Sequence, residues 1–159
     1  MILVLLGTFP TAFKRPLLEI ETLCEDGTIA EEIIVQNGYT TIESKHQVFR
    51  PFIPPDELDA LYKKARLIIT HAGTGSIIKG LKLYKKVIAI PRLAKYGEVV
   101  DDHQLEILNE FAKMNYIMPW QENVSLKSIL SAAAHFSPSP YISNKENIIN
   151  YLTNYVDSL

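Results

Sequence analysis

The chain has 159 residues, enough for one domain with a proper core and short for two. It is 47% hydrophobic and 21% charged with a formal net charge of −2, which excludes a disordered chain and gives no electrostatic footprint for nucleic acid. Cys24 is the only cysteine, so no intramolecular disulfide forms and a cytoplasmic location is expected. The apolar start is too short for a signal peptide, and nothing approaches a membrane-spanning length.

Short apolar runs rich in β-branched residues alternate with helical patterns along the chain. The runs predict strands at residues 2–6, 33–36, 47–49, 67–70 and 87–90, with a weaker one at 116–118. After the first run, Phe13, Leu17, Ile20 and Cys24 lie on one face of a helix, and Pro16 is tolerable only near its first turn.

Further helices are predicted after the third, fourth and fifth runs. One opens at Pro54 and Pro55, one follows residue 75, and one carries Leu105 and Leu108 on its inner face. A helix over 124–135 comes next.

The last segment, 136–159, is expected to be a linker and a helix. Ser143 and Glu146 form a capping box by pattern, and an apolar stripe over residues 148–156 needs a surface to pack on. We expect that surface to be this domain's own sheet, and a partner chain is the alternative.

The alternation of strands and helices predicts a single α/β domain over residues 1–159. Its expected form is a Rossmann-like three-layer α/β/α sandwich with a mainly parallel sheet. Ligands of such folds bind at the carboxyl ends of the strands. The loops at 7–11, 52–55, 71–76 and 91–102 all follow strands, so we expect them to meet at one edge.

A glycine-rich turn follows the fourth predicted strand, with the sequence His71, Ala72, Gly73, Thr74, Gly75, Ser76. Gly73 and Gly75 are expected to allow unusual backbone angles and close approach of a ligand. The helix that opens at Gly75 or Ser76 adds free N–H groups and the positive end of its dipole, which favour a phosphate or pyrophosphate.

Two familiar phosphate-binding patterns do not fit this turn. A P-loop needs lysine and a hydroxyl after its second glycine, where Leu81 and Lys82 follow Gly80. A dinucleotide fingerprint needs a third glycine where Ile78 stands. ATP-type P-loops and NAD sites are therefore disfavoured.

The sequence resembles the C-terminal domain of glycosyltransferase family 28, most closely its small stand-alone bacterial members of the PssE or EpsF type. The resemblance covers nearly the whole chain and is carried by residues 4–8, 71–76 and above all 91–104, a loop that runs from Pro91 to Asp102, His103 and Gln104. It is also similar to the catalytic subunit of the eukaryotic dolichol-linked N-acetylglucosamine transferase.

The resemblance implies the C-terminal half of a GT-B glycosyltransferase, the half that binds a UDP-sugar. A membrane-anchored partner subunit would bind the lipid-linked acceptor, and the pair would transfer a hexosyl unit with inversion in capsular or exopolysaccharide biosynthesis. This chain would then lie at the inner face of the membrane through its partner, and a homo-oligomer is possible. The alternative is a non-catalytic module that binds a nucleotide sugar and stimulates a partner glycosyltransferase.

The resemblance also implies a set of donor-binding residues. These are Gly7, Thr8, Phe52, Ile53, His71, Gly73, Thr74, Gly75, Ser76, Arg92, Asp102, His103 and Gln104. The turn would hold the pyrophosphate, Pro51 to Ile53 the base, and Asp102 and Gln104 the sugar. Lys79 stands where many relatives have an acidic ribose ligand, so the sequence departs from the family pattern at this position.

Each role has a plainer structural reading. The glycines and Thr8 suit tight turns, Ile53 suits packing, and Asp101 with Gln104 makes a capping box, so we assign Asp101 to the cap. Arg92 and Lys95 are expected on a loop beside the ligand, or as solvated surface charges.

Only His71 and Glu98 are near enough to act as a catalytic base, unless the partner supplies it. No metal or other cofactor is expected, because the chain lacks the aspartate motif that holds a divalent ion in the other major glycosyltransferase fold.

Overall fold

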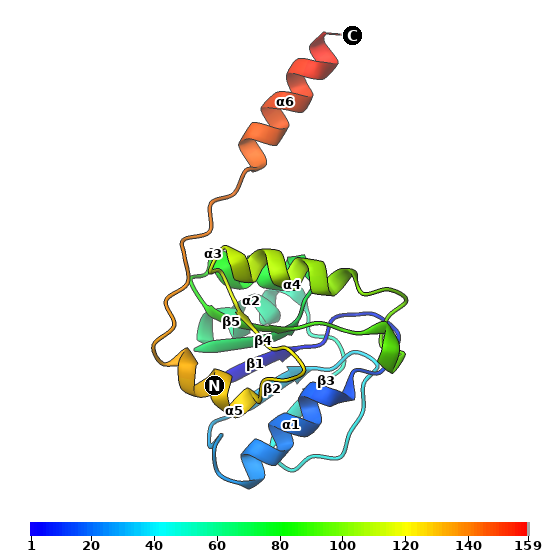
Figure 1. Ribbon diagram of the computed structural model, residues 1–159, viewed down its shortest axis with the longest axis vertical. Coiled ribbons are helices and arrows are strands. Elements are labelled where there is room, and N and C mark those ends of the chain that lie inside the picture. Colours follow the sequence, from blue (N-terminus) through cyan, green and yellow to red (C-terminus); the bar gives the residue numbers. More distant parts are fainter. Residues whose placement is uncertain (159) are drawn as a thin grey trace.

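Six parallel strands form the sheet on which the molecule is built (Figure 1). They are β1 (Ile2–Leu5), β2 (Ile33–Gln36), β3 (Gln47–Arg50), β4 (Leu67–His71), β5 (Lys86–Ile90) and β6 (Met118–Pro119), in the spatial order β3-β2-β1-β4-β5-β6. The computed structural model describes residues 1–158. Every strand overlaps a predicted run, and every pairing is parallel.

Helices cover both faces of this sheet. They are α1 (Lys14–Glu25), α2 (Pro55–Lys64), α3 (Thr74–Lys82), α4 (His103–Lys113), α5 (Leu126–Ala133) and α6 (Lys145–Asp157), with a single 3-10 turn, η1 (Ala94–Tyr96). One buried cluster joins α1 and α5 to the sheet, and a second joins α2, α3 and α4 to it. The predicted three-layer α/β/α architecture is confirmed.

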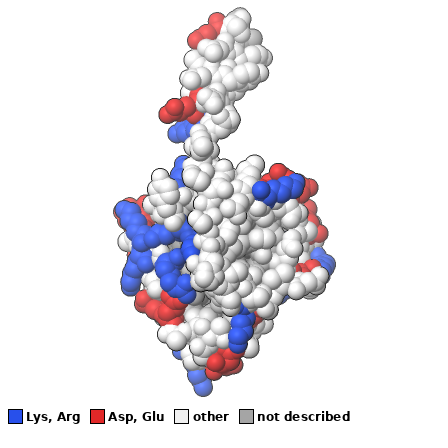
Figure 2. Space-filling view, turned by 60° about the vertical axis from the view of Figure 1, so that its left-hand side comes forward, with Lys and Arg blue, Asp and Glu red and all other residues white. Residues whose placement is uncertain are grey.

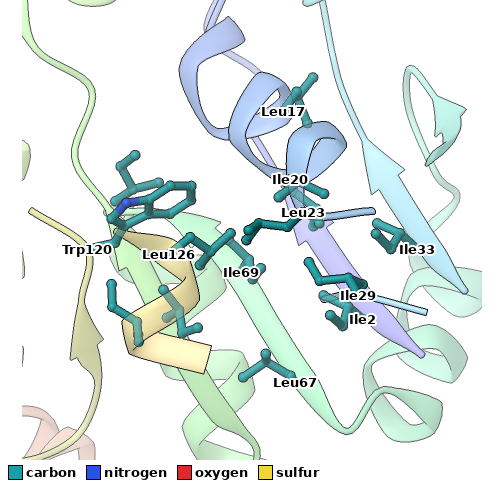
Figure 3. Packing of buried hydrophobic residues seen from close by; sticks show 14 of the residues in the cluster. Ile2, Leu17, Ile20, Leu23, Ile29, Ile33, Leu67, Ile69, Trp120 and Leu126 are labelled. Atoms are coloured by element: carbon teal, nitrogen blue, oxygen red, sulfur yellow. The ribbon is translucent and has the colours of Figure 1, made fainter. Parts of the chain in front are cut away.

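The core follows from the alternation of side chains along the central strands. Ile2 and Val4 of β1 face α1 and α5, whereas Leu3 and Leu5 face α2 and α3. Figure 3 shows the first cluster, in which Leu23 of α1 lies beside Leu126 of α5 and close to Ile69 of β4. Because both faces are covered, the central strands are mostly apolar, and polar residues lie only near the strand ends, at Thr70, His71 and Lys86.

The strand order places a topological switch point between β1 and β4. From β1 the chain builds outward through β2 and β3, and it then returns to build β4, β5 and β6 on the other side. The loops that leave β1 and β4 therefore diverge at the carboxyl edge, where folds of this type bind ligands.

Helix α6 does not pack on the sheet, so the expectation that it would is wrong. It extends away from the body of the molecule at the end of the linker (Figure 1), and its apolar side chains are exposed, from 47% at Ile149 to 63% at Val156. Tyr141 in the linker packs edge-on against Tyr116, 5.7 Å between ring centroids, so the linker is held where it leaves the body. The apolar stripe of α6 has no partner within residues 1–158.

The predicted capping box of α6 is absent as well. Asn144 is the N-cap residue and its side chain does not cap the helix. Ser143 Oγ lies 3.4 Å from the backbone nitrogen of Lys145, a long contact for a hydrogen bond. Over residues 1–158, no helix has the length and apolarity that crossing a membrane would require.

Candidate functional site

The loops after β1 and β4 meet around the imidazole of His71. A Cβ atom added at Gly7 would lie 2.7 Å from His71 Nε2, and one added at Gly73 would lie closer still. Gly7 also has a φ of +77°, which favours glycine. The ring therefore leaves room only for glycine on both of these neighbouring segments.

The expected reason for the glycines of the turn needs correction. Gly73 has an ordinary extended backbone with φ −92° and ψ 131°, and Gly75 lies in the first turn of α3. Neither has the positive φ that Gly7 and Gly38 have. Gly73 is required by the His71 ring, and Gly75 leaves open space, because nothing lies within 4 Å of a Cβ added there.

The N-terminus of α3 is open to a ligand. Gly73 is its N-cap residue and no side chain caps the helix. The amides of Thr74, Gly75 and Ser76 are the first N–H groups of the helix, which have no carbonyl partner inside a helix, and Thr74 and Gly75 are exposed. Such an end attracts anions through its N–H groups and dipole.

His71 is neutral at pH 7. Burial, followed by the nearby charge of Arg92, lowers the pKa of His71 to about 4, and a hydrogen bond with the Leu5 backbone opposes this shift only in part. Its Nδ1 lies 3.3 Å from Thr70 Oγ1. The ring adds no positive charge to the site, and with this pKa it is a weak base.

Arg92 differs from the expected loop cation. Its side chain is 1% exposed, and its guanidinium donates to the carbonyl oxygens of Leu6, Thr11 and Glu98, each at 3.0 Å. These bonds tie the loop after β1 to the loop after β5. In this structure Arg92 is a buried cross-link beneath the edge of the sheet.

Glu98 is also buried, at 4% exposure, and it pairs with a residue that the sequence did not single out. Arg15 of α1 donates to both carboxylate oxygens, from Nε at 2.8 Å and from Nη2 at 2.7 Å. The backbone N–H of Leu93 adds a third bond at 3.0 Å. A carboxylate held in this way is poorly placed to take a proton from an acceptor hydroxyl, so the structure does not support Glu98 as a base.

The sugar motif of the resemblance lies at the start of α4. Asp101 Oδ1 accepts from the N–H of His103 at 3.1 Å, whereas Asp102 is the N-cap residue by position and its Oδ1 accepts from the N–H of Ala94 at 2.8 Å. Gln104 Oε1 accepts from the N–H of Arg92 at 3.1 Å. The Asp101 and Gln104 capping box therefore does not form, and both motif side chains brace the 91–94 loop.

A cavity of about 290 Å³ opens beside this motif, lined by Asp102, Leu105 and Lys95 together with the 121–123 segment. Lys95 is exposed and pairs with Glu122 at 2.6 Å, so it is a surface ion pair as the plainer reading held. His103 is exposed and lies 3.1 Å from Glu106. Within residues 1–158, no group of three or more His, Cys, Asp or Glu side chains is arranged to hold a metal ion.

The segment predicted to contact a base lies at the same edge, over β2 and β3. Phe52 is exposed and packs edge-on against Tyr39, with 5.7 Å between ring centroids. Ile53 is buried, and its N–H donates to Gln36 Oε1 at 3.1 Å. Phe52 is thus free to contact a ligand, whereas the Ile53 amide already has a partner.

Lys79, the departure from the family pattern, points toward α2. Its ammonium group pairs with Asp59 and lies 4.9 Å from the centre of the Tyr62 ring. Tyr62 itself donates a hydrogen bond to the Ser76 carbonyl at 3.1 Å, which fixes α3 against α2.

The expected loops therefore do come together at one edge. Residues 7–11, 71–76 and 91–104 are joined by the contacts of His71 and Arg92, and residues 51–53 lie on the β2 and β3 side of that edge. The contribution of Arg15 was missed because 83 residues separate it from Glu98, and no local pattern marks such a pair.

A parallel sheet in the order 3-2-1-4-5-6, with an open helix N-terminus at its switch point, defines a Rossmann-like ligand-binding domain of the kind that forms half of a GT-B glycosyltransferase. The model of the glycosyltransferase family 28 C-terminal domain matches residues 1–157, and the chain belongs to this family.

Curated relatives match over shorter segments. The chain is 52% identical over 50 residues, 31% of its length, to the UDP-N-acetylglucosamine transferase subunit ALG13 of Candida albicans, and that match spans 16% of the relative. It is 28% identical over 80 residues, 50% of its length, to the subunit of the same name from Yarrowia lipolytica, spanning 39% of that protein. The chain thus matches less than half the length of these relatives.

Solved structures support the fold. The NMR structure of ALG13 superposes with a TM-score of 0.59 at 17% identity, covering 91% of each chain. MurG of Acinetobacter baumannii superposes with a TM-score of 0.51 at 18% identity, covering 83% of this chain and 40% of that one. The chain therefore shares its fold with nearly the whole of the solved ALG13 chain and with 40% of the MurG chain.

Proposed function

We propose that this chain is the donor-binding subunit of an inverting glycosyltransferase and that its ligand is a UDP-sugar. The observation that carries the proposal is the meeting of the 7–11, 71–76 and 91–104 loops around the uncapped N-terminus of α3. A diphosphate would lie on the amides of Thr74 to Ser76, with the sugar toward Asp102 and Gln104 and the base toward Phe52. The name of the relatives, UDP-N-acetylglucosamine transferase subunit, makes UDP-N-acetylglucosamine the first donor to test.

The acceptor side of the site would come from a second protein. One domain leaves a bound nucleotide sugar at an open edge, whereas transfer needs an aligned acceptor and exclusion of water. The relatives are named as subunits, and α6 presents an apolar stripe that this chain does not cover. We propose a membrane-anchored partner that binds a lipid-linked acceptor, which would place this chain at the cytoplasmic membrane surface, with capsule or exopolysaccharide synthesis as the setting.

The catalytic base would belong to that partner. Glu98 is held by Arg15, and the low pKa of His71 makes it a weak base. The same observations favour the second candidate function, a nucleotide-sugar-binding module that stimulates a partner without taking part in the chemistry. The two differ in whether a change at Gln104, which would face the sugar, alters the rate of transfer.

We also propose that no metal ion takes part in donor binding. The positive end of α3 and its free amides would balance the charge that develops on the leaving diphosphate.

Thermal unfolding with a panel of nucleoside diphosphates tests the proposal, because a ligand that binds only the native state raises the midpoint. We expect UDP to raise it more than ADP, GDP or CDP. Indifference to all four would contradict the donor site. Transfer assays with the partner and the Gln104→Ala variant then separate the subunit from the stimulating module, since only a catalytic site should lose activity.

A further inference from the structure

Two arginines from different parts of the chain converge on the segment around Glu98. Arg15 reaches it from the first turn of α1 and forms a two-bond ion pair with its carboxylate, and Arg92 donates to its backbone carbonyl at 3.0 Å. The Glu98 side chain is 5% exposed and that of Arg15 is 28% exposed. A carboxylate so far removed from water needs this partner to stay charged at low cost.

The ion pair is held by further contacts on the Arg15 side. The guanidinium carbon lies 4.7 Å from the centre of the Tyr96 ring and 5.4 Å from that of Phe13. Its Nη2 also donates to the Pro91 carbonyl at 3.0 Å. Arg15 thus holds residues 91, 96 and 98 at once, using the planar fork that lysine lacks.

The contacts continue from Glu98 to the motif at the start of α4. Glu98 accepts from the N–H of Leu93, and the adjoining N–H groups of Arg92 and Ala94 donate to Gln104 and Asp102. Three successive links therefore connect α1 to the two side chains that would face the sugar: Arg15 to Glu98, Glu98 to the Leu93 amide, and the amides on either side of it to Gln104 and Asp102. None of these bonds involves residues 74–76 at the N-terminus of α3.

We propose that Arg15 is a positioning residue for sugar recognition: through Glu98 it sets the 91–104 loop so that Asp102 and Gln104 meet the sugar of the donor. This inference rests on the proposed function. It divides the donor into two parts, because the UDP portion would lie on α3 and the 51–53 segment, whereas the sugar portion would depend on the braced loop. Arg15 should therefore affect the two portions unequally.

The test compares the dissociation constants of UDP and of UDP-N-acetylglucosamine by calorimetry for the full-length wild type and Arg15→Met. We expect the dissociation constant of UDP to change less than twofold. That of UDP-N-acetylglucosamine should rise about tenfold, the effect of losing one or two hydrogen bonds to sugar hydroxyls. Lys14→Met, an exposed neighbour on α1, is the matched control and should change neither constant.

A second substitution that restores affinity for the nucleotide sugar would distinguish a positioning role of Arg15 from a general structural effect. Glu98→Gln in the Arg15→Met background removes the unpaired buried charge and keeps an oxygen for the Leu93 N–H, so it should restore part of the lost affinity for the nucleotide sugar. Arg15→Lys keeps the charge and should fall between wild type and Arg15→Met; it also serves if Arg15→Met does not fold.

Four results would overturn the inference. Equal weakening of UDP and UDP-N-acetylglucosamine would make Arg15 a residue of the fold alone, and unchanged constants for both would remove its role. A wild-type chain that binds UDP but gains nothing from the sugar would refute the brace while leaving the proposed UDP site in place. A wild-type chain that binds neither ligand would refute the proposed function and the inference together.

Discussion

At the scale of single residues, the contact between Gly73 and His71 is the tightest constraint in the site. Gly73→Ala should destabilise the protein by about 2 kcal/mol, because the added methyl overlaps an imidazole that also lies against Gly7. Urea unfolding measures the loss. Gly75→Ala is the control, since the space there is open, and it should leave stability unchanged or raise it by about 0.5 kcal/mol.

Removal of the ring should relieve that overlap. The double variant Gly73→Ala with His71→Ala should lose less free energy of unfolding than the two single variants lose in total, because the methyl then occupies the space of the missing imidazole. Strict additivity would mean that the cost of Gly73→Ala arises elsewhere.

The depressed pKa of His71 predicts a pH dependence of stability. Its folded value of about 4 lies below the ordinary value of 6.5, so between these limits the unfolded chain binds more protons. The stabilisation is therefore complete above about pH 6.5 and is lost as the pH falls toward 4, with an upper limit of about 3.5 kcal/mol at roughly 1.4 kcal/mol per pKa unit. Urea midpoints at pH 7, 6 and 5 should fall more steeply for wild type than for His71→Gln. Parallel curves would contradict a buried neutral imidazole.

The burial of Arg92 and Glu98 could not be predicted from the sequence. Single arginines and glutamates on a loop are usually solvated, and nothing near Arg92 or Glu98 in the chain signals that both are buried. Their partners, Thr11 and Arg15, lie more than 80 residues away. The glycine turn and the Asp102 to Gln104 motif, in contrast, are local patterns that the sequence alone shows.

At the scale of elements, α3 would do the work that a metal ion does in other transferases. If its amides and dipole hold the diphosphate, the dissociation constant of UDP should be the same within twofold with and without EDTA. Calorimetry in matched buffers measures it. A loss of affinity of tenfold or more on chelation, restored by Mg²⁺ or Mn²⁺, would contradict a metal-free site.

Helix α6 should contribute almost nothing to the stability of the body, because it does not pack on it. Truncation after residue 143 should leave the thermal midpoint of the body within about 1 °C, because the apolar side chains of α6 are exposed and belong to neither core cluster (Figure 2). Most of the α6 surface in that view carries no charged side chain. Ile129→Ala in α5 is the contrasting control and should cost about 2 to 5 kcal/mol, because Ile129 lies in the core. A large drop on truncation would show that α6 packs on its own domain.

Periodicity predicted the elements well because it reports burial directly. Strands β1, β2, β4 and β5 are apolar runs since helices cover both of their faces, and α1 shows its buried face at Leu17 and Ile20. The same signal gave a wrong prediction for α6. An apolar stripe indicates that a helix face packs on something, but it does not indicate whether the partner is the same chain or another one. The two predicted capping boxes do not form. The Gln104 side chain accepts a hydrogen bond from the Arg92 amide instead, and Ser143 Oγ lies too far from the helix amide.

At the scale of the whole molecule, the open edge of the sheet predicts that donor binding and sugar transfer have different requirements. Every group proposed to hold the donor lies in this chain, so the isolated protein should bind UDP. The acceptor, the base and the exclusion of water are proposed to come from a partner, so it should not transfer sugar alone. We expect transfer to a lipid-linked acceptor to appear when the membrane-anchored partner is added and to level off at equimolar chains.

The α6 truncation joins these expectations in one experiment. The shortened chain should bind UDP with wild-type affinity by calorimetry, because α6 lies far from the donor edge (Figure 1). It should nevertheless show no sugar transfer in the presence of the partner, because it lacks the apolar stripe of α6 that would dock on the partner. Full transfer by the shortened chain would show that the partner docks elsewhere, and transfer by the intact chain alone would refute the division of the active site between two proteins.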